Sequence, residues 1–239
     1  MTSPSLLDQT EFADNPEPRC PVVLLLDTSG SMNGAPIEQL NGALQTFSRE
    51  LKADPLASLR VEVAVITFGG EVRAVDVTGE GQLDALDASR AFITVDRFVP
   101  PTLQARGGTL MGEATRRALD LLRQRKEIYK QNSADYFRPW VFLITDGKPT
   151  DVWQSAAEQA RLEESRKGLL FFGIGVEGAD LKALSQFCPP NRPPLKLKGL
   201  AFSELFQWLS KSLSAVAHSK LGEQVPLPPV GWAEIETSK

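Results

Sequence analysis

Apolar residues follow two alternating patterns along the chain. Continuous short runs such as 22–26, 140–145 and 169–176 are typical of strands buried on both faces of a parallel sheet. In other segments apolar residues recur every three or four positions, which predicts amphipathic helices, chiefly 36–53, 110–130, 152–167 and 202–218. Because strands and helices alternate, we predict an α/β fold with a doubly wound, mostly parallel central sheet and helices on both faces.

One edge of the predicted sheet has a different pattern. The strand 60–68 alternates in polarity, Gly69-Gly70 favours a tight hairpin, and 72–77 is expected to return as an antiparallel edge strand. The pattern then weakens up to residue 106, where only a short helix at 83–88 is predicted. A short helix at 179–187 and a brief strand at 195–198 complete the expected elements.

The two ends of the chain lack this periodicity. Residues 1–19 are rich in Pro, Ser and acidic residues, and we interpret them as a flexible N-terminal arm before a domain at 20–219. Residues 220–239 form a Pro-rich tail that is expected to be extended. Within it, Trp232 is equally compatible with a solvated end and with packing back on the domain or on a partner.

Charge and rare residues narrow the function classes. A net charge of −4 argues against nucleic-acid binding, and no apolar run approaches the roughly 20 residues that span a bilayer. The acidic N-terminus does not resemble a secretory signal, so we expect a cytoplasmic protein with no membrane association. The only histidine, His218, is far from the other candidate residues, which disfavours Ser-His and Cys-His nucleophiles.

Oxygen-bearing side chains follow the buried strands. Asp27, Ser29 and Ser31 come directly after the strand 22–26, Asp146 follows 140–145, and Thr109 precedes a helix. In open α/β sheets the carboxyl ends of strands form the ligand site, so these loops are expected to converge. Carboxylate and hydroxyl oxygens suit Mg²⁺, with Mn²⁺ or Ca²⁺ as alternatives. Taken alone, however, the first group is also compatible with a helix cap or turn.

The motif Asp27-x-Ser29-x-Ser31, together with Thr109 and Asp146, resembles the metal-ion-dependent adhesion site of the von Willebrand factor type A (VWA) domain. This resemblance covers about residues 22–218. Within it, the sequence segments 26–38 and 145–153 are similar to those of the TerY group of bacterial tellurium-resistance-associated proteins. It implies a Rossmann-like domain that binds Mg²⁺ at these five residues, and a protein partner whose acidic residue completes the metal's ligands. It also implies a stress-response assembly with an associated kinase or phosphatase, and a non-enzymatic role.

Two other functions stay open. Asp27 at a strand end is compatible with a metal-dependent phosphohydrolase, although Ser29 stands where the second acid of such enzymes would donate a proton. Other members of the superfamily are subunits of ATPase-driven metal-insertion or remodelling complexes, of the AAA type. Near Asp146, the side chains of Asp151 and Trp153 are equally compatible with a binding rim and with a helix cap and a packed aromatic.

Overall fold

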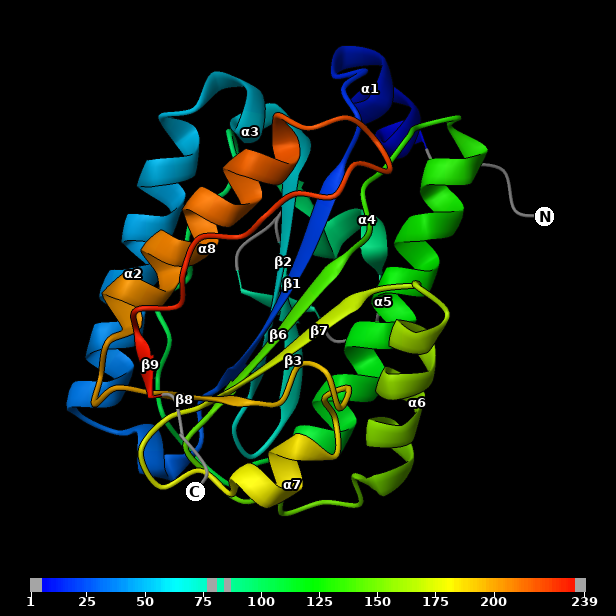
Figure 1. Ribbon diagram of the computed structural model, residues 1–239. Coiled ribbons are helices and arrows are strands. Elements are labelled where there is room, and N and C mark those ends of the chain that lie inside the picture. The colour runs from blue at the N-terminus through cyan, green and yellow to red at the C-terminus, as the bar shows by residue number, and fades with distance from the viewer. Residues whose placement is uncertain (1–5, 77–80, 84–86, 235–239) are drawn as a thin grey trace.

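The computed structural model describes residues 6–76, 81–83 and 87–234. Its centre is a twisted sheet, visible edge-on in Figure 1, with the strand order β4-β3-β2-β1-β6-β7-β8-β9 and with β5 pairing beside β3 on the edge of β2. The strands are β1 (Cys20–Asp27), β2 (Val61–Phe68), β3 (Val72–Val75), β4 (Gln82–Leu83), β5 (Ile93–Thr94), β6 (Trp140–Thr145), β7 (Leu170–Gly175), β8 (Leu195–Leu197) and β9 (Ala233–Glu234).

Helices cover both faces of this sheet, as predicted. One face carries α2, α3 and α8 and the other carries α4, α5, α6 and α7, so each face has its own apolar core (Figure 1). The helices are α1 (Leu6–Asp14), α2 (Ala35–Lys52), α3 (Pro55–Arg60), α4 (Ala88–Ala91), α5 (Met111–Gln131), α6 (Gln154–Ser165), α7 (Leu181–Ser185) and α8 (Phe202–Ala217). None of the described helices is long and apolar enough to cross a bilayer.

The five central strands, β2, β1, β6, β7 and β8, are parallel to one another. All residues of β1 and β6 are buried, which explains why these strands read as continuous apolar runs rather than as alternating ones. Antiparallel pairs occur only at the edges among the described residues: β3, β4 and β5 beyond β2, and β9 beside β8. The predicted fold class is confirmed.

The weakly patterned segment differs from the prediction of a helix at 83–88. Leu83 ends the short strand β4, and the helix α4 begins only at Ala88, where the side chain of Asp87 accepts a hydrogen bond from the backbone N–H of Ser89. Residues 84–86 lie outside the described residues. The predicted helix is therefore misplaced, because an Asp cap fixes a helix start more strongly than a weak apolar spacing does.

The expected flexible arm is wrong for the described residues, because 6–14 form the helix α1. The side chain of Phe12 in this helix is buried. The guanidinium carbon of Arg19 lies 4.8 Å from the centroid of the Phe12 ring, and the ring packs edge-on against Tyr129. Glu11 pairs with Arg125 of α5, which lies 114 positions further along the chain. The local sequence pattern does not reveal this docking, because Arg125 and Tyr129, which contact α1, lie far along the chain in α5.

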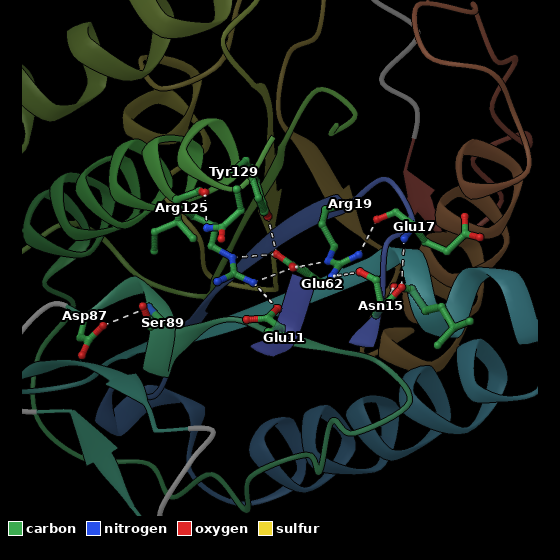
Figure 2. A network of polar contacts seen from close by, with 12 residues as sticks. Glu11, Asn15, Glu17, Arg19, Glu62, Asp87, Ser89, Arg125 and Tyr129 are labelled. Atoms are coloured by element: carbon green, nitrogen blue, oxygen red, sulfur yellow. Dashed lines mark hydrogen bonds and ion pairs between the residues drawn. The ribbon is translucent and has the colours of Figure 1, made fainter. Parts of the chain in front are cut away.

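A buried ionic network fastens this N-terminal segment to the domain (Figure 2). The carboxylate of Glu62 accepts hydrogen bonds from Arg19 Nε at 2.9 Å and from Arg125 Nε at 3.0 Å, and also from the Tyr129 hydroxyl. Burial alone would raise the pKa of Glu62, but the positive charges of Arg125 and Arg19 outweigh it and lower that pKa. Two cations therefore keep this fully buried carboxylate ionised.

Trp232 and Ala233 of the C-terminal tail pack on the domain, whereas most of the preceding tail residues are exposed. Trp232 is 3% exposed and lies edge-on to Trp208 of α8, with ring centroids 5.7 Å apart. The Trp208 indole N–H in turn donates to the carbonyl of Pro228 at 2.8 Å. Just after Trp232, the strand β9 adds to the sheet edge, so of the two alternatives for this residue the packed one is correct.

Candidate metal centre

Asp27 and Asp146 lie at the carboxyl ends of neighbouring parallel strands. Asp27 is the last residue of β1, Asp146 follows β6, and the two strands pair in register from Val22 with Trp140 to Leu26 with Ile144. After β1, the next strand in sequence, β2, adds to one side of β1, whereas β6 adds to its other side. The acidic residues therefore stand where the strand order reverses, the usual ligand position of open α/β sheets.

Two hydroxyls link the first loop to the second acid. The hydroxyl of Ser31 donates to Asp146 Oδ1 at 2.7 Å and lies 3.0 Å from the hydroxyl of Ser29. Ser29 is buried while Ser31 is exposed, so the row of oxygens runs from the sheet edge outward to solvent. Residues that are 115 positions apart in sequence thus form one polar cluster.

Thr145 is a functional neighbour that the sequence reasoning missed. Its hydroxyl donates to Asp27 Oδ2 at 2.5 Å, and the backbone N–H of Ser29 donates to Asp27 Oδ1 at 2.8 Å. The β1–β6 register places Thr145 beside Asp27, so knowledge of that strand pairing would have identified it. Both oxygens of the Asp27 carboxylate are consequently oriented by the protein.

The loop that carries Thr109 is held against the other two by its backbone. The N–H of Gly30 donates to Gly107 O at 2.9 Å, and the N–H of Thr150 donates to Thr109 O at 2.9 Å. Gly107 has a φ of 74° and packs so tightly that an added Cβ would lie 2.4 Å from the Cα of Gly70. Only glycine combines this backbone conformation with so close an approach.

The Thr109 hydroxyl faces the residue that follows Asp146. A Cβ at Gly147 would lie 2.7 Å from Thr109 Oγ1, so the absence of a side chain at 147 leaves the room that Thr109 occupies. All five side chains of the predicted metal site are therefore brought to one place by three loops: Asp27, Ser29, Ser31, Thr109 and Asp146.

Burial disfavours the charged forms of the Asp27 and Asp146 carboxylates. It raises the pKa of Asp27 to about 6, against hydrogen bonds from Thr145 and Ser29 that favour the charged form, and the charge of Asp146 raises it further. Burial likewise raises the pKa of Asp146, although the hydrogen bond from Ser31 opposes this. A cation placed between two such carboxylates would favour their charged forms.

The donor set fits a hard divalent cation. It consists of carboxylate and hydroxyl oxygens, the ligands that Mg²⁺, Mn²⁺ and Ca²⁺ prefer, and includes no imidazole or thiolate. Across the described ranges, no group of three or more His, Cys, Asp or Glu side chains is placed to hold a metal, and the candidate site itself contains only two such residues, Asp27 and Asp146. A metal here would depend on the hydroxyls as well as on the two acids.

Asp151 and Trp153 have structural contacts instead of forming a free rim. The carboxylate of Asp151 accepts from the backbone N–H groups of Gly112 at 3.0 Å and Glu113 at 2.7 Å, so it caps the first turn of α5. Trp153 stacks on Phe187 with ring centroids 5.6 Å apart. Of the two alternatives for these residues, the cap and the packed aromatic are correct.

Comparison with known families identifies the domain. The profile of the von Willebrand factor type A domain matches residues 22–202, most of the chain, and the protein therefore belongs to this family. Inter-alpha-trypsin inhibitor heavy chain H4 of Sus scrofa is 29% identical over 134 residues. That match covers 54% of this chain but only 12% of the relative, so the chain spans a small part of that protein's length.

Solved structures share the fold at low sequence identity. The pilus adhesin SpaC of Lactobacillus rhamnosus GG superimposes with a TM-score of 0.57 at 16% identity, over 83% of this chain and 31% of that one. The vWF domain of the type V pili tip protein Mfa5 of Porphyromonas gingivalis gives 0.53 at 11% identity, over 85% and 98%. Proximal thread matrix protein 1 of the mussel byssus gives 0.52 at 17%, over 83% and 48%.

Proposed function

We propose that the protein is a non-enzymatic, metal-dependent protein-interaction module. In this proposal Asp27, Ser29, Ser31, Thr109 and Asp146 hold Mg²⁺, with Mn²⁺ and Ca²⁺ as alternatives, and a carboxylate of a partner protein completes the metal's ligands. The observation that carries it is the row of oxygens from Ser29 through Ser31 to Asp146, beside the oriented carboxylate of Asp27. Divalent cations commonly accept such an external oxygen ligand.

We further propose that the module works in a cytoplasmic bacterial stress-response system of the tellurium-resistance type, with an associated kinase or phosphatase. Support for this narrower assignment comes from the sequence phrases at 26–38 and 145–153, which resemble the TerY group. The net charge of −4 agrees with a partner other than nucleic acid.

The phosphohydrolase alternative has less support. Such enzymes pair the nucleophilic carboxylate with a second acid that donates a proton to the leaving group. The neighbouring position that would hold a proton-donating acid is Ser29. Turnover of an aryl phosphate that disappears in Asp27→Asn would favour hydrolysis over the proposal.

Titration calorimetry tests the metal site. The wild-type protein should bind Mg²⁺ and Mn²⁺ with measurable heat, and Asp27→Ala should bind neither, because the remaining hydroxyls and one carboxylate make a poor site. Asp120→Asn on the exposed side of α5 is the matched control and should bind both metals like the wild type. Identical heats from Asp27→Ala and the wild type would overturn the proposal.

Affinity purification from cells tests the partner. A partner that binds through the metal should be retained by the wild-type protein in Mg²⁺ and released by a chelator. The Asp146→Ala variant should not retain it, whereas the control Asp120→Asn should. Recovery of a kinase or phosphatase would support the stress-response assignment, whereas an AAA-type ATPase would replace it with a remodelling complex.

A further inference from the structure

A cavity lies along the face of β2 that looks toward α2, and at one end it reaches Thr28, which stands between Asp27 and Ser29 of the candidate metal centre. The cavity has a volume of about 590 Å³, and its floor consists of the alternate residues Val63, Val65 and Thr67. Pockets that bind small molecules are usually roughly 300–1,000 Å³ in volume. Because successive residues of a strand point to opposite faces, these three side chains lie on the same face of β2.

The covering of this face explains why a cavity exists. Most of the sheet is covered by helices, but here the cover is the irregular segment 98–106, which contains Pro100-Pro101. A helix with its side chains is about 10–12 Å wide, so a single extended segment in its place leaves space beneath it. The segment contributes Phe98 and Leu103 as apolar walls.

Hydrogen bonds from α2 hold the cover in position. The side chain of Asn41 donates to Leu103 O at 3.0 Å and accepts from Leu103 N–H at 2.8 Å. Ser48 donates to Phe98 O at 3.3 Å. Between these two fixed points Val99 is 78% exposed, so an apolar side chain stands at the mouth of the cavity. The cavity is thus bounded by segments that the protein itself fixes.

The charges around the cavity leave one cation unmatched. Glu71 pairs with Arg73 at 2.9 Å and also with Arg106, and Asp76 pairs with Arg90. Arg97 also lines the cavity, and within the described part of the chain its guanidinium has neither a hydrogen-bond nor an ion-pair partner. An anionic group would complement this charge.

We propose that this cavity binds a small amphipathic molecule, a long-chain carboxylate, with its apolar chain along Val63 and Val65 and its carboxylate at Arg97. Arg97 follows β5, which pairs with Glu62 and Val63, so the anionic end belongs at the start of β2. Beyond this floor the cavity lining continues along the chain to Gly69, so that it spans six residue steps from Val63, on the order of 20 Å, which accommodates an extended chain. This inference does not rest on the proposed metal function, although Thr28 of the metal-site loop also lines the cavity.

Fluorescence of anilinonaphthalene sulfonate, a probe with apolar rings and one anionic group, tests the site on the full chain. All titrations contain a chelator, so that no carboxylate can bind through a metal at Asp27 and Asp146. The probe should bind with saturable emission, dodecanoate should displace it, and dodecanol should displace it more weakly. Absence of saturable binding would overturn the proposal.

Variants locate the site. Arg97→Gln should weaken dodecanoate about 3- to 5-fold, as expected for loss of one partly exposed charge pair, and leave dodecanol unchanged. The control is Arg123→Gln, which replaces an exposed arginine of α5, far from the cavity lining in sequence. This variant should bind dodecanoate like the wild type. Equal weakening of dodecanoate and dodecanol by Arg97→Gln would contradict a charge pairing at that residue.

Filling the cavity gives an independent readout. Val65→Phe places a ring on the cavity floor and should reduce probe binding more than 10-fold, while the melting temperature reports whether the variant folds. If Val65→Phe does not fold, Val99→Asp at the exposed mouth replaces it and should weaken the probe without changing the core. Probe binding that is unchanged in Arg97→Gln and in the folded filling or mouth variant would place the probe elsewhere and overturn the proposal.

Discussion

The hydroxyl of Ser31 donates a 2.7 Å hydrogen bond to Oδ1 of Asp146. This contact joins the loop after β1 to the loop after β6, across the point where the strand order reverses. Because Ser31 is exposed, a ligand arriving from solvent reaches the same oxygens that form the contact. Binding of a cation there should therefore tighten two loops together and stabilise the folded chain.

Metal binding should raise the melting temperature. A ligand at about 100 times its dissociation constant stabilises the native state by about 2.7 kcal/mol, which corresponds to about 5–10 °C for a chain of this size. Asp146→Ala should abolish this shift in scanning calorimetry with Mg²⁺. Asp151→Ala removes the cap of α5 and should lower the starting melting temperature yet keep the shift. A full shift in Asp146→Ala would contradict metal binding at this residue.

The candidate site could be predicted from the sequence because its residues follow strands that are easy to recognise. Asp27 and Asp146 each end a continuous apolar run, and parallel strands bring such ends to one edge of the sheet. The hydrogen bond from Thr145 to Asp27 could not be predicted in the same way. It depends on which strands are neighbours and in which register they pair, and neither is encoded in a local pattern.

The ends of the chain show the same limit. Phe12 and Trp232 both lie in segments that are rich in polar residues and prolines, where local propensity favours irregular structure. Each is buried against residues outside its own segment pattern: Phe12 against Arg19, just before β1, and Tyr129 of α5, and Trp232 against Trp208 of α8. Tertiary packing thus overrides a weak local preference, and single-residue anchors of this kind leave no periodic signal.

The buried carboxylate of Glu62 should be among the most sensitive positions for stability. Glu62→Gln removes the negative charge between Arg19 and Arg125, whose side chains are both 0% exposed, and so leaves two buried cations poorly compensated. Breaking a buried ion pair typically costs about 3–5 kcal/mol. Urea unfolding should show a loss of this size.

The matched control for Glu62 is Glu127→Gln. Glu127 pairs with Lys130 on the exposed side of α5, where both side chains are more than half exposed, so its loss should leave the free energy of unfolding almost unchanged. Similar losses from the two substitutions would show that the network around Glu62 contributes no more than a surface pair.

Asp54 should make stability depend on pH in the acid range. Burial would raise the pKa of Asp54, but hydrogen bonds from Ser214, from the Ala57 N–H and from His218 outweigh it and lower that pKa from 3.8 to about 2. Since the folded value is below the unfolded one, the ionised group stabilises the fold above about pH 4, and this contribution is lost as the pH falls toward 2.

Asp54→Ala tests this pH dependence. It removes the cap of α3 and should cost about 1 kcal/mol near neutral pH. Urea unfolding of the wild type and the variant across the acid range should show the difference shrinking from about pH 4 downward. A difference that stays constant down to about pH 2 would mean that the charge of Asp54 does not contribute.

The side chain of Trp232 should contribute to anchoring the C-terminal tail through packing and without a hydrogen bond of its own. Its ring is buried against Trp208, and among the described residues its indole N–H has no hydrogen-bond partner. Trp232→Ala should therefore lower the free energy of unfolding by about 3 kcal/mol, since a large buried aromatic is lost, and Trp232→Phe should cost about 1 kcal/mol because an aromatic ring remains and no hydrogen bond is broken. Urea unfolding of the three proteins measures both differences. A loss below about 0.5 kcal/mol in Trp232→Ala would contradict the packed tail, because such a value is typical of a surface position.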